Sequence, residues 1–276
     1  MKFHIKRGDS FTNIRINEAS FVVGKHWFWD EVSDKWESET QNFFSTNIVR
    51  GSDYLDIGGW VGFTAMMATA LGARRVDIVE PNPMNFISLL TTQLSNENLM
   101  KNWCLSNSCV SASDSNQFIG PFEKIFTSSS NGQTSFDEQG GVEVFSLTMS
   151  KFRENKKDYS LIKIDIEGVE QYILEDLLIF RDTRAAIWLS LHPAMLLRQG
   201  DDLEVYWQKL ASLSADFFFS DGNNREIDTE ILKERVLSKE DRPSWGTEWG
   251  NLFEIGLLPK RYFKLSSSDK ILTRTN

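Results

Sequence analysis

A glycine-rich turn is the sequence feature that most constrains the fold of this chain. Residues 54–62 read Tyr-Leu-Asp-Ile-Gly-Gly-Trp-Val-Gly, so a short apolar run is followed by three glycines. Residues 63–71 are rich in Ala and Met and predict a helix. A glycine turn between a strand and a helix lets a ligand approach the backbone and the helix N-terminus. The turn therefore predicts the first strand–helix unit of a ligand-binding α/β fold.

The next apolar strand ends in an acidic residue. Residues 76–80 read Val-Asp-Ile-Val-Glu, and Glu80 is followed by Pro81 and Asn82. An acid at the end of the second parallel strand can accept hydrogen bonds from a ribose diol. The turn and Glu80 together predict half of a nucleotide-type cofactor site.

The charge and spacing of the turn discriminate between cofactors. The dinucleotide pattern G-x-G-x-x-G is not met, because Gly58 and Gly59 are adjacent and Gly62 follows. A carboxylate at Asp56 would repel a pyrophosphate but suits a cationic ligand. S-adenosylmethionine carries a sulfonium, an amino group and a ribose, so the sequence favours it over NAD. The alternative is a structural turn whose glycines serve only tight packing.

A third motif places charges at the end of an apolar strand. Residues 160–170 read Ser-Leu-Ile-Lys-Ile-Asp-Ile-Glu-Gly-Val-Glu, and Lys163 and Asp165 share one face of the strand. Buried parallel strands are normally continuous apolar runs, and buried charges are costly unless paired or facing a cleft. We expect Asp165 and Glu167 at the mouth of the cleft, where open α/β sheets bind ligands. The alternative is a buried Lys163–Asp165 ion pair with a structural role only.

These stretches resemble FkbM-type S-adenosylmethionine-dependent methyltransferases. The resemblance is carried by residues 54–62, 79–83 and 161–170, of which Lys-Ile-Asp-x-Glu-Gly-x-Glu is the most specific. Weaker similarities lie at Trp27–Asp30, in the loop 132–135 and at Ser190–Pro193, so the resemblance covers residues 20 to 220. Two positions depart from the family: Gly59 where many relatives have Ala, and Thr148 where an Asp is usual.

The alternation of strands and helices from residue 52 onward predicts a parallel sheet covered on both faces. One of these helices, residues 83–94, has Met84, Ile87, Leu90 and Leu94 about one face. Another helix is expected over residues 170–180, whereas residues 244–251 in the tail show no periodicity. With the resemblance, we expect an α/β fold: a Rossmann-like, doubly wound, mostly parallel sheet of the class I methyltransferase type. Residues 1–50 are expected to form a β-rich, aromatic extension packed on a methyltransferase domain of residues 51–276.

The cofactor site follows from the motifs and from the place of adenine in this fold, near the end of a strand over residues 103–110. The predicted cofactor-binding residues are Asp56, Gly58, Gly59, Gly62, Glu80, Pro81, Asn82, Ser111, Ala112, Ser113 and Asp165.

Methyl transfer needs an aligned acceptor and a group that withdraws its proton. His192 follows a strand predicted over residues 185–191, and its ordinary pKa of about 6.5 suits this task near neutrality. Asp165 is the competing base, and Glu167 is the third predicted catalytic residue. Asp165, Glu167 and His192 are also a conceivable site for Mg or Mn, which would activate a hydroxyl as a Lewis acid.

The resemblance, rather than the composition, implies O-methylation of a sugar hydroxyl in a glycan or glycoconjugate. The alternatives are a natural-product scaffold, an amine acceptor, or a non-catalytic Rossmann-type module in glycan assembly. The predicted substrate-binding residues are Trp36, Glu37, Lys163 and Thr134. Trp27, Trp29 and Trp36 are equally suited to packing in the core.

Composition excludes several classes of partner. The net charge of −9 argues against nucleic acid, which requires a basic footprint. Cys104 and Cys109 are too few for a disulfide framework. No apolar run approaches the ~20 residues of a membrane span, and the N-terminus has no signal-peptide core. We therefore expect a soluble, cytoplasmic protein that acts on a small molecule or glycan.

Overall fold

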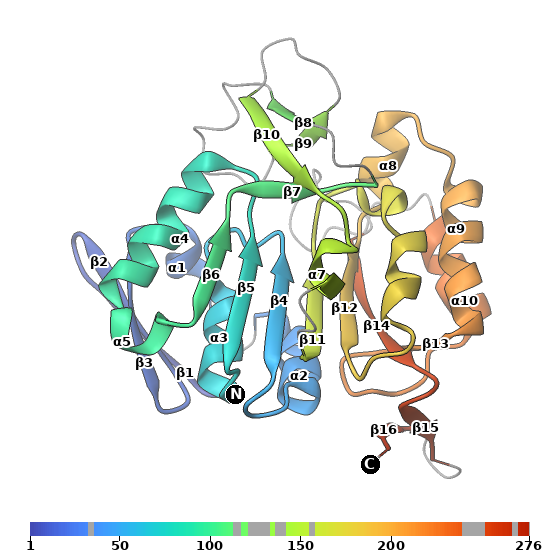
Figure 1. Cartoon of the computed structure of the whole chain (residues 1–276), viewed down its shortest axis with the longest axis horizontal. Coiled ribbons are helices and arrows are strands. Elements are labelled where there is room, and N and C mark those ends of the chain that lie inside the picture. Colours follow the sequence, from blue (N-terminus) through green and yellow to red (C-terminus); the bar gives the residue numbers. More distant parts are fainter. Residues whose placement is uncertain are drawn as a thin grey trace.

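The computed structural model describes residues 1–32, 36–112, 117–120, 133–135, 142–154, 158–238, 252–266 and 270–275. A seven-stranded sheet forms its centre, in the order β13-β14-β12-β11-β4-β5-β6 (Figure 1). Strands β12, β11, β4, β5 and β6 run parallel, and β14 runs antiparallel to both of its neighbours. This order and direction are those of class I methyltransferases, so the predicted fold class is confirmed.

The strands of this sheet are β4 (Asp53–Ile57), β5 (Arg75–Val79), β6 (Trp103–Ser106), β11 (Tyr159–Ile164), β12 (Ala186–Leu191), β13 (Phe217–Ser220) and β14 (Phe253–Pro259). The other strands are β1 (Phe3–Arg7), β2 (Phe11–Ile16), β3 (Ala19–Gly24), β7 (Ser108–Val110), β8 (Gln117–Gly120), β9 (Gln133–Ser135), β10 (Val142–Leu147), β15 (Phe263–Leu265) and β16 (Leu272–Arg274).

The α-helices are α1 (Phe28–Glu31), α2 (Ser38–Asn47), α3 (Phe63–Leu71), α4 (Pro83–Ser95), α5 (Glu97–Met100), α7 (Lys151–Glu154), α8 (Pro193–Gln199), α9 (Leu203–Ser212) and α10 (Thr229–Leu237). Three 3₁₀ helices are η1 (Glu170–Tyr172), η2 (Glu175–Phe180) and η3 (Leu213–Ala215).

Two cores lie on the two faces of the sheet because neighbouring strand residues point in opposite directions. Leu55 and Ile57 belong to a cluster with η2, α8, α9 and α10, whereas Tyr54 belongs to a cluster with α2 and α3. The sheet is therefore covered by helices on both faces, as the doubly wound prediction requires. Asp56, between Leu55 and Ile57, lies on the face of α2 and α3.

The N-terminal β1–β2–β3 sheet packs on the second of these cores. Ile14, Ile16, Phe21 and Val23 are buried in the same cluster as α3. The predicted β-rich extension is thus confirmed as a separate antiparallel sheet, while the division into domains at residue 50 stays a prediction.

Three segments differ from the predictions. The strand expected over residues 103–110 is broken between β6 and β7, because the Asn107 side chain donates to the carbonyls of Glu80 and Pro81, and β7 then pairs with β10 in a separate four-stranded sheet. The helix expected over residues 170–180 is two short 3₁₀ helices. Strand β14, in a tail without readable periodicity, inserts between β12 and β13 as a buried strand.

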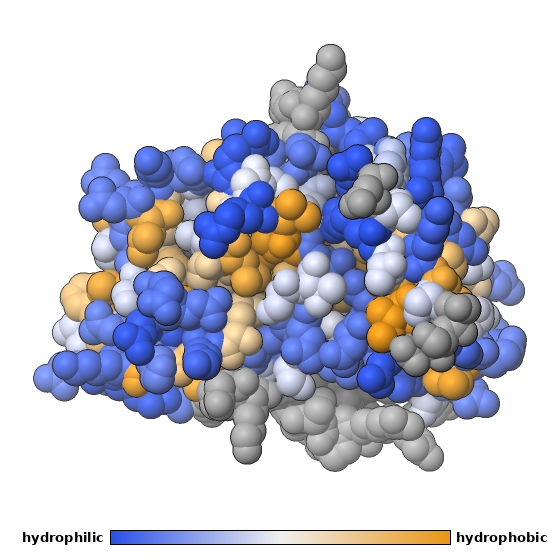
Figure 2. All heavy atoms as spheres, turned by 90° about the horizontal axis from the view of Figure 1, so that it is seen from below, coloured by the Kyte–Doolittle hydropathy of each residue, from blue (hydrophilic) through white to orange (hydrophobic). Residues whose placement is uncertain are grey.

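The arrowheads of the parallel strands point to the top of Figure 1, so ligand-binding loops are expected at that end. Figure 2 views the opposite end, which is mostly hydrophilic with separate apolar patches. Among the described residues, no helix combines the length and apolar character needed to cross a bilayer.

Candidate active site

The glycine turn after β4 is held against both neighbouring strands. The N–H groups of Gly58 and Gly59 both donate to the carbonyl oxygen of Val79. Gly58 has a φ of +85°, and a Cβ on it would lie 1.8 Å from the carbonyl oxygen of Asp165. A Cβ on Gly59 would lie 2.2 Å from Cγ2 of Ile78. Tight packing therefore requires these glycines, and the same approach brings the turn next to Asp165.

The carboxylate of Glu80 joins the turn to the start of α4. Its Oε2 accepts from the backbone N–H of Trp60 at 2.7 Å, and its Oε1 accepts from the N–H of Asn82 at 2.8 Å and from Asn85 Nδ2 at 3.4 Å. Burial raises the pKa of Glu80 to about 7. A carboxylate has about four acceptor positions, so Glu80 retains capacity for a ribose hydroxyl.

Asp56 is the second acid of the predicted cofactor site. Thr64 Oγ1 donates to its Oδ2 at 2.7 Å, whereas its Oδ1 has no hydrogen-bond partner among the described residues. The side chain is fully buried, and burial raises its pKa to about 6 although Lys163 opposes the shift. A buried acceptor without a donor fits a ligand that supplies one, such as the amino group of S-adenosylmethionine.

Of the remaining predicted cofactor residues, Gly62 ends this turn, Asn82 precedes α4, and Ser111 and Ala112 follow β7. Gly62 starts α3 with a φ of +83°, and a Cβ there would lie 2.7 Å from Leu89. Asn82 caps α4 by accepting from the N–H of Met84 at 2.9 Å. The Ser111 hydroxyl bonds to that of Ser146 at 2.5 Å, and Ala112 is exposed. Ser113 lies outside the described residues.

Lys163 and Asp165 form the expected ion pair at the end of β11. Lys163 Nζ lies 3.0 Å from Asp165 Oδ2. Burial lowers the pKa of Lys163, but Asp165, Asp56 and Glu37 together raise it above its ordinary value. Burial opposes ionisation of Asp165, yet Lys163 and His192 hold its pKa below the usual range. Both side chains are therefore charged at neutral pH.

His192 lies between two carboxylates at the end of β12. Its Nδ1 is 2.6 Å from Glu170 Oε1, and its Nε2 is 3.5 Å from Asp165 Oδ1. Burial lowers the pKa of His192, but Glu170 and Asp165 overcome this and raise it to about 9. The expectation of an ordinary histidine pKa is therefore wrong, and the imidazole is protonated at neutral pH.

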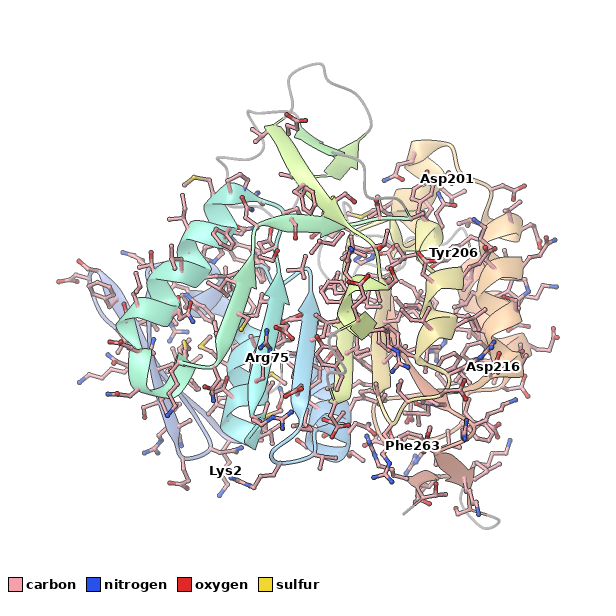
Figure 3. All side chains as sticks on the ribbon, viewed as in Figure 1. Lys2, Arg75, Asp201, Tyr206, Asp216 and Phe263 are labelled. Carbon is pink, nitrogen blue, oxygen red and sulfur yellow. The ribbon has the colours of Figure 1, made fainter. Side chains whose placement is uncertain are left out.

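Glu170 is the residue that sequence reasoning missed. Both of its carboxylate oxygens accept from the N–H of Gly168, at 3.1 and 3.0 Å, and the side chain is fully buried. Tyr206, on α9 (Figure 3), has its pKa raised by burial and by the charge of Glu170. Glu170 closes the Lys-Ile-Asp-x-Glu-Gly-x-Glu motif, so the sequence contained the signal for it.

The predicted metal site gains no support from the geometry. Within the part of the chain that the structure describes, no group of three or more His, Cys, Asp or Glu side chains is arranged to hold a metal ion. Both nitrogens of His192 face carboxylates. Glu167 lies in the following turn with a φ of +54° and contributes to the raised pKa of His192.

Two further carboxylates face the same ion pair from other elements. Glu37, just before α2, accepts from Thr40 Oγ1 at 3.0 Å, and burial and Glu254 raise its pKa well above the ordinary value. Glu254 lies on β14 opposite Ser190, and burial and Asp165 raise its pKa to about 7. No motif marks Glu254, because only the antiparallel pairing of β14 with β12 brings it here.

The N-terminal aromatic residues form one cluster beside the glycine turn. Trp29 is buried and therefore packs in the core. Trp36 is half-buried, with its ring 5.4 Å from that of Phe28 and 5.0 Å from that of Phe63. Trp27 is exposed and lies 5.7 Å from the ring of Trp60, within the turn. Thr134 lies on β9, but its side chain is outside the described part.

This sheet order, with a glycine turn after β4 and an acid after β5, defines a class I S-adenosylmethionine-dependent methyltransferase domain. Residues 51–218 match the family model of the Methyltransferase FkbM domain. The match spans more than half of the chain, which therefore belongs to the FkbM methyltransferase family. No curated protein matches the chain.

Solved structures give more distant similarities. A methyltransferase FkbM from Methylobacillus flagellatus KT is 14% identical with a TM-score of 0.37, and the match covers 54% of this chain and 36% of that one. A dimethyladenosine transferase from Plasmodium falciparum is 10% identical, with a TM-score of 0.44 over 82% and 62% of the two chains. A putative methyltransferase from Streptococcus mutans is 12% identical, with a TM-score of 0.42 over 92% and 56%. The chain thus spans about a third of the length of the FkbM structure.

Proposed function

We propose that this domain transfers a methyl group from S-adenosylmethionine to a hydroxyl of a sugar, in a glycan or glycoconjugate. The observation that carries the proposal is that His192 lies between the carboxylates of Asp165 and Glu170, and that Asp165 adjoins the glycine turn. Bound S-adenosylmethionine supplies an electrophilic methyl group on a sulfonium. The protein supplies the alignment of the acceptor and a place for its proton.

Asp165 is the one of these three residues that reaches the acceptor. Its side chain is 34% exposed, whereas that of His192 is 1% exposed. The Asp165 carboxylate would accept the hydrogen bond of the acceptor hydroxyl and take its proton, while the methyl group passes from sulfur to that oxygen and the sulfonium leaves as a neutral thioether. A weak base suffices, because an oxygen that gains a methyl group becomes strongly acidic. His192 and Glu170 hold Asp165 in position, so the role first assigned to His192 passes to Asp165.

A sugar fits the remaining polar groups. Glu37, Asp165 and Glu254 surround Lys163, and carboxylates accept hydrogen bonds from hydroxyls. The aromatic cluster with Trp36 offers a flat face for the C–H groups of a sugar ring. We assign Glu37, Lys163 and Trp36 to the acceptor side on this basis, while Thr134 stays a prediction from the sequence. The cofactor residues are assigned to the turn, Glu80 and the Ser111 segment. A metal ion has no role in this proposal.

Mass spectrometry tests the proposal directly. Glycans with free hydroxyls are incubated with the protein and S-adenosylmethionine, and the product is located by fragmentation. One added methyl on a ring oxygen supports the proposal. Methylation of an amine, or of a natural-product hydroxyl but no glycan, overturns the acceptor class. Failure to bind S-adenosylhomocysteine in calorimetry would favour the non-catalytic module instead.

A further inference from the structure

Helix α4 turns an apolar face to solvent. Along its outer face Met84 is 40% exposed, Ile87 53%, Leu90 40% and Leu94 70%. The side that packs on the molecule carries Asn85, Leu89 and Thr92 instead. An amphipathic helix normally directs its apolar stripe to the core. Because α4 lies on the near side of the molecule in Figure 1, in front of the β1–β2–β3 sheet and beside β6, the stripe is available to another surface.

The spacing of this face is that of a helix-pairing seam. The seam consists of Met84, Ile87 and Leu94 with the exposed Thr91, and Leu90 flanks it. These four seam positions follow one another at intervals of three, four and three residues, as a and d positions do. These intervals are the same in both directions along the helix. An antiparallel copy of α4 would therefore place Met84 against Leu94 and Ile87 against Thr91, twice, around a two-fold axis. The surface is complementary to itself.

The absence of charged residues around the seam favours a second copy of this chain over other partners. Residues 81–96 contain no Asp, Glu, Lys or Arg, although the whole chain carries a net charge of −9. Seams that choose a different partner carry charged flanking residues, and membrane-surface helices carry Lys or Arg. Two copies that each carry a net negative charge can therefore associate through this uncharged face with little electrostatic repulsion.

We propose that this chain forms a two-fold dimer in which α4 packs antiparallel against α4 of a second copy. Leu99 on α5, which is also exposed, extends the contact. One helix pair covers less than the ~800 Å² per partner of a standard interface, so we expect a weak dimer that is in equilibrium with the monomer. The dimer would fix α4, whose first turn is hydrogen-bonded to Glu80 in the cofactor site.

Sedimentation equilibrium over micromolar concentrations tests the dimer. The mass should rise from 31.7 kDa toward twice that value. Ile87→Glu should weaken dimerisation at least tenfold. The matched control is Ile231→Glu on α10, a residue that is 50% exposed outside the seam and should leave dimerisation unchanged. Circular dichroism verifies that both variants fold. A wild-type chain that stays monomeric, or a control that dissociates equally, overturns the proposal.

A charge swap tests the antiparallel orientation. Met84→Glu and Leu94→Lys should each weaken the dimer, and the double variant should restore it, because each acid then faces a lysine of the other copy. A parallel pairing would instead place like charges together, and the double variant would stay monomeric. If the wild-type protein is monomeric and binds neutral lipid vesicles, the proposal is overturned and the stripe binds a membrane surface instead of a second copy.

Discussion

His192 Nδ1 lies 2.6 Å from Oε1 of Glu170, and both side chains are buried. This pairing keeps a proton on the imidazole well beyond neutral pH, since the pKa of His192 is raised to about 9. Lys163 and this cation together hold the pKa of Asp165 below its usual range, although burial opposes its ionisation. A protonated His192 cannot take up the acceptor's proton at neutral pH, so in the proposed mechanism it acts through Asp165.

The first prediction concerns stability against pH. The folded pKa of His192 is above the unfolded value of about 6.5, so its contribution to stability is complete below pH 6.5 and is lost as pH rises through 9. The melting temperature should therefore fall between pH 7 and pH 9. In His192→Gln this part of the decline should be absent. An identical pH profile for both proteins would contradict the assigned pKa.

The second prediction concerns the base. Asp165→Asn should lower kcat roughly a hundredfold, because it removes the proton acceptor, while cofactor affinity changes little.

Glu170→Gln should lower kcat less and should shift the pH dependence of kcat, because His192 loses the neighbour that raises its pKa. Equal pH profiles for Glu170→Gln and wild type would reduce Glu170 to a packing residue. If Asp165→Asn keeps wild-type turnover, the base is His192, and His192→Ala should then lose about a hundredfold.

The third prediction concerns the cofactor. Glu80→Ala removes the acceptor for a ribose hydroxyl and should weaken S-adenosylmethionine binding about ten- to a hundredfold, from about 1.5–3 kcal/mol of charge-assisted bonding. The control is Asp77→Asn in β5, the strand that precedes Glu80. It weakens contacts with Arg75 and Tyr159 and should lower the melting temperature only. Calorimetry gives both affinities. Unchanged binding in folded Glu80→Ala would move the cofactor elsewhere.

The fourth prediction concerns the acceptor. Trp36→Leu removes a half-buried aromatic face and should raise KM for the acceptor, while cofactor affinity is retained. Trp29→Leu, at a buried position, should lower the melting temperature and leave KM unchanged. If Trp36→Leu behaves like Trp29→Leu, residue 36 is part of the core and no aromatic platform exists there.

Local signals made the first half of the fold predictable. Gly62 and Gly72 both adopt positive φ and bound α3, so its ends coincide with the prediction. The apolar stripe of α4 was also visible in the sequence, but periodicity does not say which side meets the protein. There the N-cap Asn82 and the packing of Leu89 orient the helix, so that the stripe faces outward.

The pKa values at the candidate site depend on contacts between residues that are distant in the sequence. Glu170 is 22 residues from His192, and Glu254 reaches the site only through the antiparallel pairing of β14. The charges of the neighbouring side chains decide the protonation of His192. The composition does not say how close those side chains lie to the imidazole. The sequence therefore predicts which residues gather at the cleft better than it predicts what each one does.

The carboxylate of Glu80 binds the N–H of Trp60 in one loop and that of Asn82 in the next. The group expected to recognise the ribose is therefore also the link between the loop after β4 and the loop after β5. A substitution meant to alter cofactor preference at this position would also free both loops. Redesign of cofactor selectivity in this domain has to begin at other residues, with Glu80 left in place.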